Sequence, residues 1–208
     1  MIDINTLLTY AVVVLGLFLI PGPAVLLVLA RATAGGRRVG IATGLGIACG
    51  DLLHTVMATV GLSAILMTSA LAFSIVKYAG AAYLIYLGVR ALFERNHDLQ
   101  LTAARLVNAP LAFRQAVLAE LLNPKTALFF LAFLPQFVRP GHGAIAAQLA
   151  TLGLVFAVMS AGYATMIAIA AGQVGRWLSR HRQIGRWQGR VVGTIYLTLG
   201  VRLALQQR

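Results

Sequence analysis

The chain has 208 residues, of which 60% are hydrophobic and 11% charged, and its mean hydropathy is +0.86. Soluble domains carry roughly 25% charged residues, and none of this size could bury so much apolar surface, so the excess is expected to face lipid. The net charge of +12 would suggest nucleic-acid binding in a soluble chain. Here the basic residues lie between apolar runs with no basic-aromatic recognition module, so no nucleic-acid partner is expected.

Six apolar runs have the composition of membrane spans, each of which takes about 20 residues of helix. They cover about residues 4–30, 39–66, 71–93, 110–138, 144–171 and 191–205, and the last of them is short. A polar and basic connector at 94–109 lies between the third and fourth runs. The sequence therefore predicts an all-α polytopic membrane protein, with one transmembrane domain over residues 1–208 and six transmembrane helices.

The first three runs and the last three share features that indicate an internal repeat. The first and fourth runs both contain a proline break, and the Leu-Gly-Val-Arg at 87–90 that ends the third run recurs at 199–202 in the sixth. Because three spans per half is an odd number, the second half must be inverted relative to the first. Inverted halves with broken helices are typical of secondary transporters. We therefore expect two inverted three-helix repeats, at about 1–93 and 110–208, with helices 1 and 4 broken.

The basic residues predict the orientation. If all six runs cross, the connectors around 31–38, 90–114 and 176–190 share one side of the membrane, and they hold twelve arginines against three on the other side. Lys and Arg accumulate on the cytoplasmic side of membrane proteins. The connectors are therefore expected in the cytoplasm and both termini outside. If the short sixth run does not cross, the C-terminus lies inside.

The first run is interrupted by Pro21, Gly22 and Pro23. Proline lacks a backbone donor and clashes one turn back, and unpaired backbone groups are costly in lipid, so such a break persists only where protein or water receives those groups. Half-helix ends at a break can hold a carboxylate or a cation. We expect these residues to belong to a substrate site, and the alternative is a kink that serves packing.

The fourth run has a second break at Asn123, Pro124 and Lys125. Lys125 lies near the middle of its run, where an ammonium group is costly unless it is paired. It is expected to bind a substrate carboxylate or to pair with a buried acid. A lysine that snorkels to the membrane surface is the alternative.

Two acids and a histidine also fall inside apolar runs. Asp51 lies near the membrane midplane, where it can bind a substrate ammonium or take a proton, unless it is a protonated structural acid. His54 shares its helix face and could relay protons, although a buried neutral histidine is the favoured interpretation. Glu120 is either a second acid on the path or a vestibule residue. No second histidine or cysteine pattern accompanies them, so no metal or cofactor is expected.

Glycines recur at four-residue spacing in the second run. One series is Gly36, Gly40 and Gly44, and another is Gly46 and Gly50. Small residues at this spacing let helices approach closely, so we expect them to serve packing. The same feature would serve a homodimer.

Together these elements resemble the LysE/RhtB family of bacterial amino-acid exporters. The matching pieces are the Pro-Gly-Pro at 21–23, the glycine-rich stretch 36–50 before Asp51, KYAGAAYLIYLGVR at 77–90, and Asn-Pro-Lys at 123–125 followed by Leu-Pro-Gln-Phe at 134–137. The resemblance implies a six-helix protein of the bacterial inner membrane that expels an amino acid or a close derivative, driven by the proton gradient. It implies that Asp51 is the family's membrane acid and that the two proline motifs are its substrate-site breaks, whereas Glu120 and His54 match no clear motif.

The expected function is therefore export of an amino acid by a secondary transporter, with Asp51 and Lys125 matching the two charges of a zwitterion. Its expected partners are the amino acid, protons and membrane lipid. A heavy-metal or inorganic-cation exporter that uses the buried acids and His54 is the alternative. An enzyme is not expected, because the sequence has neither a Gly-x-Ser-x-Gly elbow nor a His-Glu-x-x-His motif.

Overall fold

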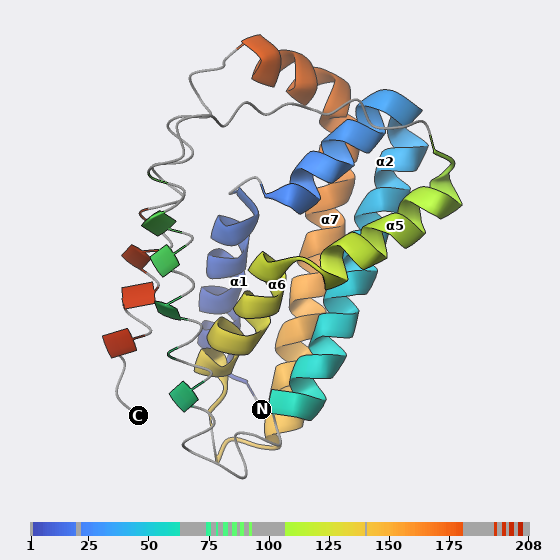
Figure 1. Cartoon of the computed structure of the whole chain (residues 1–208). Helices are drawn as coiled ribbons and strands as arrows, with labels where there is room; N and C mark the ends of the chain where they lie inside the picture. The colour runs from blue at the N-terminus through green and yellow to red at the C-terminus, as the bar shows by residue number, and fades with distance from the viewer. Residues whose placement is uncertain are drawn as a thin grey trace.

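The computed structural model describes residues 2–19, 22–62, 107–139 and 141–180, together with isolated positions between 74 and 92 and between 194 and 205. All regular structure in this described part is helical (Figure 1). The elements are α1 (Ile4–Leu19), α2 (Pro23–Met57), the π-helical turn η1 (Ala58–Leu62), α5 (Ala109–Leu121), α6 (Pro124–Leu128), the π-helical turn η2 (Phe129–Phe133), the 3-10 turn η3 (Leu134–Phe137) and α7 (Ile145–Arg180).

Two described helices are long and apolar enough to cross a membrane, at Pro23–Gly61 and Ile145–Ala171. The pair Ala109–Leu121 and Pro124–Phe137, bent by 47° at its break, is a third if it counts as one span. Most of the third and sixth expected runs and of the connector at 94–109 lies outside the described residues. The six-helix inverted repeat therefore stays a prediction.

Both helix breaks lie where the prolines predict them. In the first run α1 ends at Leu19 and α2 begins at Pro23, and in the fourth run α5 ends at Leu121 and α6 begins at Pro124. Each proline is the first residue of its helix, a position where the missing N–H has no intrahelical partner to lose. Pro21 lies outside the described residues.

Gly36 divides α2 into two parts. Its φ of 80° and ψ of 175° are non-helical and fall in a region that side chains with a Cβ rarely adopt. The helix changes direction at this end of the molecule (Figure 1). Residues 23–35 thus complete the broken first run, and the segment after Gly36 forms the second run.

The two glycine series of α2 pack against different helices. A Cβ added at Gly44 would lie 2.8 Å from the Cβ of Ala164 on α7, whereas one at Gly46 would meet the carbonyl oxygen of Phe113 on α5. Gly50 faces α5 as well, with the Cβ of Glu120 2.6 Å from the added atom. The missing side chains therefore let α2 touch α5 and α7 at once, which agrees with the expected packing role. The homodimer stays a prediction.

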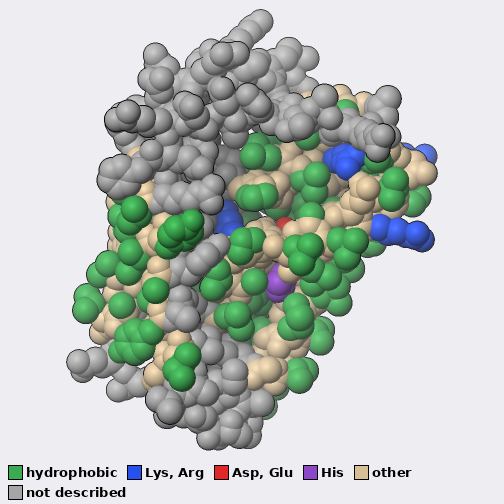
Figure 2. All heavy atoms as spheres, viewed as in Figure 1, with side chains coloured by type: hydrophobic (Ala, Val, Ile, Leu, Met, Phe, Trp, Pro, Cys, Tyr) green, Lys and Arg blue, Asp and Glu red, His purple; other side chains and the backbone are tan. Residues whose placement is uncertain are grey.

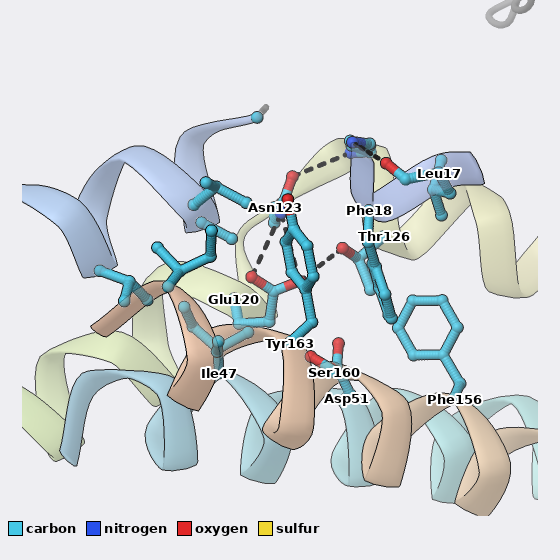
Figure 3. A pocket seen from close by; sticks show the side chains of 17 residues that line it. Leu17, Phe18, Ile47, Asp51, Glu120, Asn123, Thr126, Phe156, Ser160 and Tyr163 are labelled. Atoms are coloured by element: carbon cyan, nitrogen blue, oxygen red, sulfur yellow. Dashed lines mark hydrogen bonds between the residues drawn. The ribbon is translucent and has the colours of Figure 1, made fainter. Parts of the chain in front are cut away.

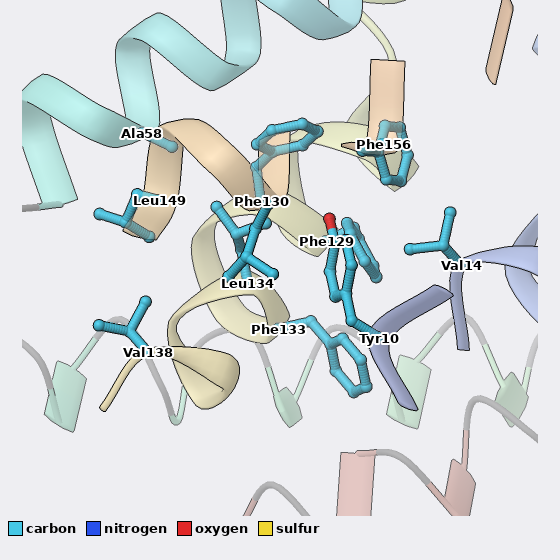
Figure 4. Close-up of a cluster of buried hydrophobic side chains, with 11 residues drawn as sticks. Tyr10, Val14, Ala58, Phe129, Phe130, Phe133, Leu134, Val138, Leu149 and Phe156 are labelled. Atoms are coloured by element: carbon cyan, nitrogen blue, oxygen red, sulfur yellow. The ribbon is translucent and has the colours of Figure 1, made fainter. Parts of the chain in front are cut away.

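Two apolar clusters form the core at different heights of the bundle. The aromatic cluster consists of Tyr10, Val14, Ala58, Phe129, Phe130, Phe133, Leu134, Val138, Leu149, Leu152 and Phe156 (Figure 4). The small-residue cluster consists of Val28, Leu29, Ala32, Ile47, Ala116, Ala164, Ala168 and Ala171. On α7 the first cluster occupies positions before Ser160 and the second occupies positions after it. A layer between the clusters, at the level of Ser160, is thus left for other side chains.

The surface of the described part carries many large apolar side chains (Figure 2). Examples are Val12 on α1, 71% exposed, and Val158 on α7, 65% exposed. Such a surface is unfavourable in water and suits lipid, in agreement with an integral membrane protein.

An ion pair joins the start of α1 to the end of η3. Arg139 Nη1 lies 2.7 Å from Asp3 Oδ2, and Asp3 Oδ1 also accepts a hydrogen bond of 2.8 Å from the backbone N–H of Thr6. Hydrogen bonds from Thr6, with a smaller contribution from the Arg139 charge, hold the pKa of Asp3 below its ordinary value. Asp3 thus caps α1 at its N-terminus.

The basic connector expected after the fifth run, at 173–190, begins as a helix, because α7 continues to Arg180. A helix gains a backbone hydrogen bond with each added residue, and leaving the lipid does not end it. Arg176, Leu178 and Arg180 in this segment are good helix formers.

We predict that Gly46→Ala destabilises the protein by about 1–3 kcal/mol, because the new methyl group overlaps the Phe113 carbonyl. Gly162→Ala is the matched control, since a Cβ at Gly162 meets nothing within 4 Å and alanine favours a helix over glycine. Thermal unfolding of both variants in detergent measures the difference. Equal melting temperatures would contradict the packing assigned to Gly46.

Candidate functional site

A cavity lies between α1, α2, the α5–α6 break and α7, in the layer between the two clusters (Figure 3). The space between its atoms amounts to about 550 Å³, a figure that includes the part open to solvent. Its lining residues are Leu17, Phe18, Gly22, Ala24, Val25, Val28, Ile47, Asp51, Glu120, Asn123, Lys125, Thr126, Phe156, Ser160, Tyr163, Ala164 and Ile167. The cavity thus brings together five of the nine predicted site residues: Gly22, Asp51, Glu120, Asn123 and Lys125.

Asp51 is the one buried carboxylate of the described part whose two oxygens both lack a hydrogen-bond partner. Its side chain comes from α2 and is 1% exposed, beside Ser160 of α7 (Figure 3). A buried polar group without a partner is costly and rare in folded proteins. The arrangement therefore leaves a carboxyl group that a cationic ligand or a proton can satisfy.

Glu120, by contrast, is held by its neighbours at the second break. Its carboxylate accepts hydrogen bonds from Asn123 Nδ2, at 3.2 Å to each oxygen, and from the Thr126 hydroxyl. Asn123 Oδ1 in turn accepts the backbone N–H of Lys125 at 3.1 Å, which caps α6. Glu120 therefore lines the cavity but is tied into the structure of the break.

His54 is directed away from Asp51, although the two residues share a helix face. Its Nε2–H donates to the backbone carbonyl of Glu120 at 3.0 Å, and its ring stacks on Phe130 with centroids 5.7 Å apart. The Glu120 carbonyl lies in the last turn of α5, where it also accepts the backbone N–H of Asn123 at 3.0 Å. The geometry supports a structural role for His54 at the break.

Lys125 joins the two breaks to each other. Its Nζ donates to the carbonyl of Leu17, in the last turn of α1, at 3.1 Å. A Cβ at Gly22 would lie 3.4 Å from the same nitrogen. A cation at a helix C-terminus is favourable both as a donor and through the helix dipole. Lys125 therefore satisfies the end of α1 while its charge remains at the wall of the cavity.

The contribution of α7 to the cavity was not predicted from the sequence. Ser160 and Tyr163 line the cavity with Phe156 of the same helix, and the Tyr163 ring stacks on Phe18 with centroids 5.6 Å apart. The sequence feature that could have predicted this contribution is a serine and a tyrosine three residues apart, which share one face of an otherwise apolar run. Pro23 and Pro124 begin the helices beside the cavity but do not line it.

The chain matches the model of the LysE type translocator family over residues 15–207. It belongs to this family. The expected resemblance is thus confirmed, and the chain is classed with transport and efflux proteins of the membrane, a family of translocators and not of enzymes.

Relatives of this LysE type translocator cover nearly the whole chain. An uncharacterized membrane protein of Pseudomonas aeruginosa is 32% identical, over 94% of this chain and 93% of the relative. Another, of Bacillus subtilis, is 30% identical, over 97% of this chain and 99% of the relative. A leucine efflux protein of Salmonella typhimurium is 26% identical, over 96% of this chain and 94% of the relative. No solved structure matches the chain significantly.

We predict that Lys125→Met lowers the stability of this translocator by about 1–3 kcal/mol, because the Leu17 carbonyl loses its donor. Lys125→Arg keeps a donor and a charge and is the matched control. Thermal unfolding in detergent, compared with transport, separates two roles of the residue. A Lys125→Met protein of wild-type stability would contradict the capping role assigned to this lysine.

Proposed function

We propose that this LysE-family protein exports an α-amino acid across the bacterial cytoplasmic membrane, with its binding site in the cavity between the two broken helices. The observation that carries the proposal is Asp51, a buried carboxylate with both oxygens unsatisfied in the described structure. A substrate ammonium group is a suitable partner for it. The leucine efflux relatives support export of an amino acid.

The opposite charge of a zwitterion has a counterpart in the same cavity. Lys125 contributes an ammonium group, and the N-terminus of α2 contributes the positive end of its helix dipole through Gly22 and Ala24, which line the cavity. The Lys125 ammonium group is held at this wall by its hydrogen bond to the Leu17 carbonyl. We propose that the substrate carboxylate binds on this side, with its ammonium group at Asp51.

The Asp51 carboxylate can also bind a proton, and this suggests how export is coupled to the proton gradient. When the site is empty, an ionised Asp51 would have to be carried through the conformational change without a partner, at a high cost in low-dielectric surroundings. A proton bound to Asp51 removes that cost. We propose that substrate leaves with Asp51 ionised and that the empty carrier returns with Asp51 protonated, so that an inward proton gradient drives export.

The proposal places the whole of 1–208 in one transmembrane domain of the inner membrane, with the arginine-rich connectors in the cytoplasm and both termini outside. Gly22, Pro23, Asn123 and Pro124 then shape the site through the helix breaks, together with Pro21, which lies outside the described residues. The second break is held by two hydrogen bonds at Glu120. Its side chain accepts from Asn123, and its backbone carbonyl accepts from His54.

We predict that Asp51→Asn lowers amino-acid efflux at least a hundredfold, because the neutral amide neither pairs with the ammonium nor exchanges a proton. Asp3→Asn is the matched control: it removes an acid from an exposed surface pair, and such pairs contribute little. The measurement is efflux of labelled amino acids from proteoliposomes that contain the full chain, with and without a pH gradient.

The control for folding is the size-exclusion profile of each variant in detergent. Undiminished efflux by a folded Asp51→Asn protein would exclude the role proposed for Asp51. Movement of a metal cation, with no amino acid moved, would replace the proposal by the cation-exporter alternative.

A further inference from the structure

The cavity is polar on one side and apolar on the other. Asp51, Glu120, Asn123, Thr126 and Ser160 gather around the α5–α6 break (Figure 3). Toward the small-residue cluster, the lining consists of Ala24, Val25, Val28, Ile47, Ala164 and Ile167. A ligand held by its charges at the polar side must therefore place the rest of its structure against this apolar lobe.

The described lining holds three charged side chains, Asp51, Glu120 and Lys125. In the proposed site Asp51 takes the ammonium group and Lys125 faces the carboxylate, while the oxygens of Glu120 already accept from Asn123 and Thr126. A cationic side chain would need another unsatisfied acid, and an anionic one another cation. The described lining offers no further Asp, Glu, Lys or Arg, and a buried charge without a partner is strongly unfavourable.

The apolar lobe is also well enclosed. Val28 is 1% exposed and Ile47 5%, whereas Val25 and Ile167 are partly buried and pack against the same cluster. Each methylene group that a ligand buries against such a surface strengthens binding about fourfold. An aliphatic side chain of three or four carbons is therefore expected to bind at least tenfold more tightly than the methyl group of alanine.

We infer that the exported amino acid carries an uncharged aliphatic side chain, and that Ile47 in the lining of the apolar lobe sets the size of side chain accepted. This inference rests on the proposed function and names its substrate class. It makes Ile47 a specificity-determining residue, placed on the same helix as Asp51 and about one turn before it.

The test is competition against labelled leucine in proteoliposomes that contain the full wild-type chain. Leucine, isoleucine and valine are expected to compete at least a hundredfold better than lysine or glutamate, and at least tenfold better than alanine. Lysine or glutamate competing as well as leucine would overturn the inference and leave the proposed function standing. If no amino acid of any class moves, the proposed function itself fails.

Substitutions at Ile47 test the specificity role. Ile47→Ala enlarges the lobe and is expected to raise the ratio of kcat/KM for phenylalanine over leucine about tenfold, with a smaller rise for Ile47→Val. Ile41→Ala is the matched control, because Ile41 packs against the same cluster but does not line the cavity. A purely structural role would lower transport of both substrates together, so a ratio that stays constant in both Ile47 variants would refute the assignment.

Discussion

Broken helices inside lipid leave backbone carbonyls without donors, and the bilayer offers no water to replace them. In this protein a side chain from elsewhere in the fold donates to a carbonyl at each break, and at the α5 break the backbone N–H of Asn123 donates to the same Glu120 carbonyl. Lys125 donates to the carbonyl of Leu17 at the end of α1, and His54 donates to the carbonyl of Glu120 at the end of α5. The first bond ties one break to the other, and the second ties the α5 break to α2. The geometry of the cavity depends on these two hydrogen bonds.

Asp51 differs from the polar side chains around it, because neither of its carboxylate oxygens has a hydrogen-bond partner. Around it, Glu120, Asn123 and Thr126 form a closed set of hydrogen bonds, and the helix ends have their caps. Among the buried side-chain atoms without a hydrogen-bond partner in the described part, two are the Asp51 oxygens, and the others are the hydroxyls of Tyr10 and Thr59. A carboxylate is the costliest of these groups to leave unpaired. That contrast, and not the presence of an acid as such, supports a role for Asp51 in transport.

Close approach of the helices makes this arrangement possible. Gly46 and Gly50 bring α2 against α5, and Gly44 brings the same helix against α7, so that Asp51 reaches both the break and Ser160. The apolar clusters lie on either side of the cavity along α7. In the aromatic cluster, Phe156 also lines the cavity, and its ring lies 5.0 Å from that of Phe129 and 5.1 Å from that of Phe130. The cavity is therefore walled by aromatic rings toward the start of α7.

The sequence by itself determined the membrane character, the two proline breaks and the candidate charges, because these follow from composition and from local backbone chemistry. It could not decide which of the candidate side chains line the cavity and which are held by hydrogen bonds to other helices. Asp51 and His54 share a helix face, yet only Asp51 lines the cavity, because the Glu120 carbonyl attracts His54 from another helix. Glu120 and Lys125 do not share a straight helix face, yet both line the cavity because the break lies between them. Hydrogen-bond partners from distant segments exist only in the tertiary structure, and they distinguish Glu120 and His54, whose side chains are hydrogen-bonded at the break, from Asp51, whose oxygens have no hydrogen-bond partner.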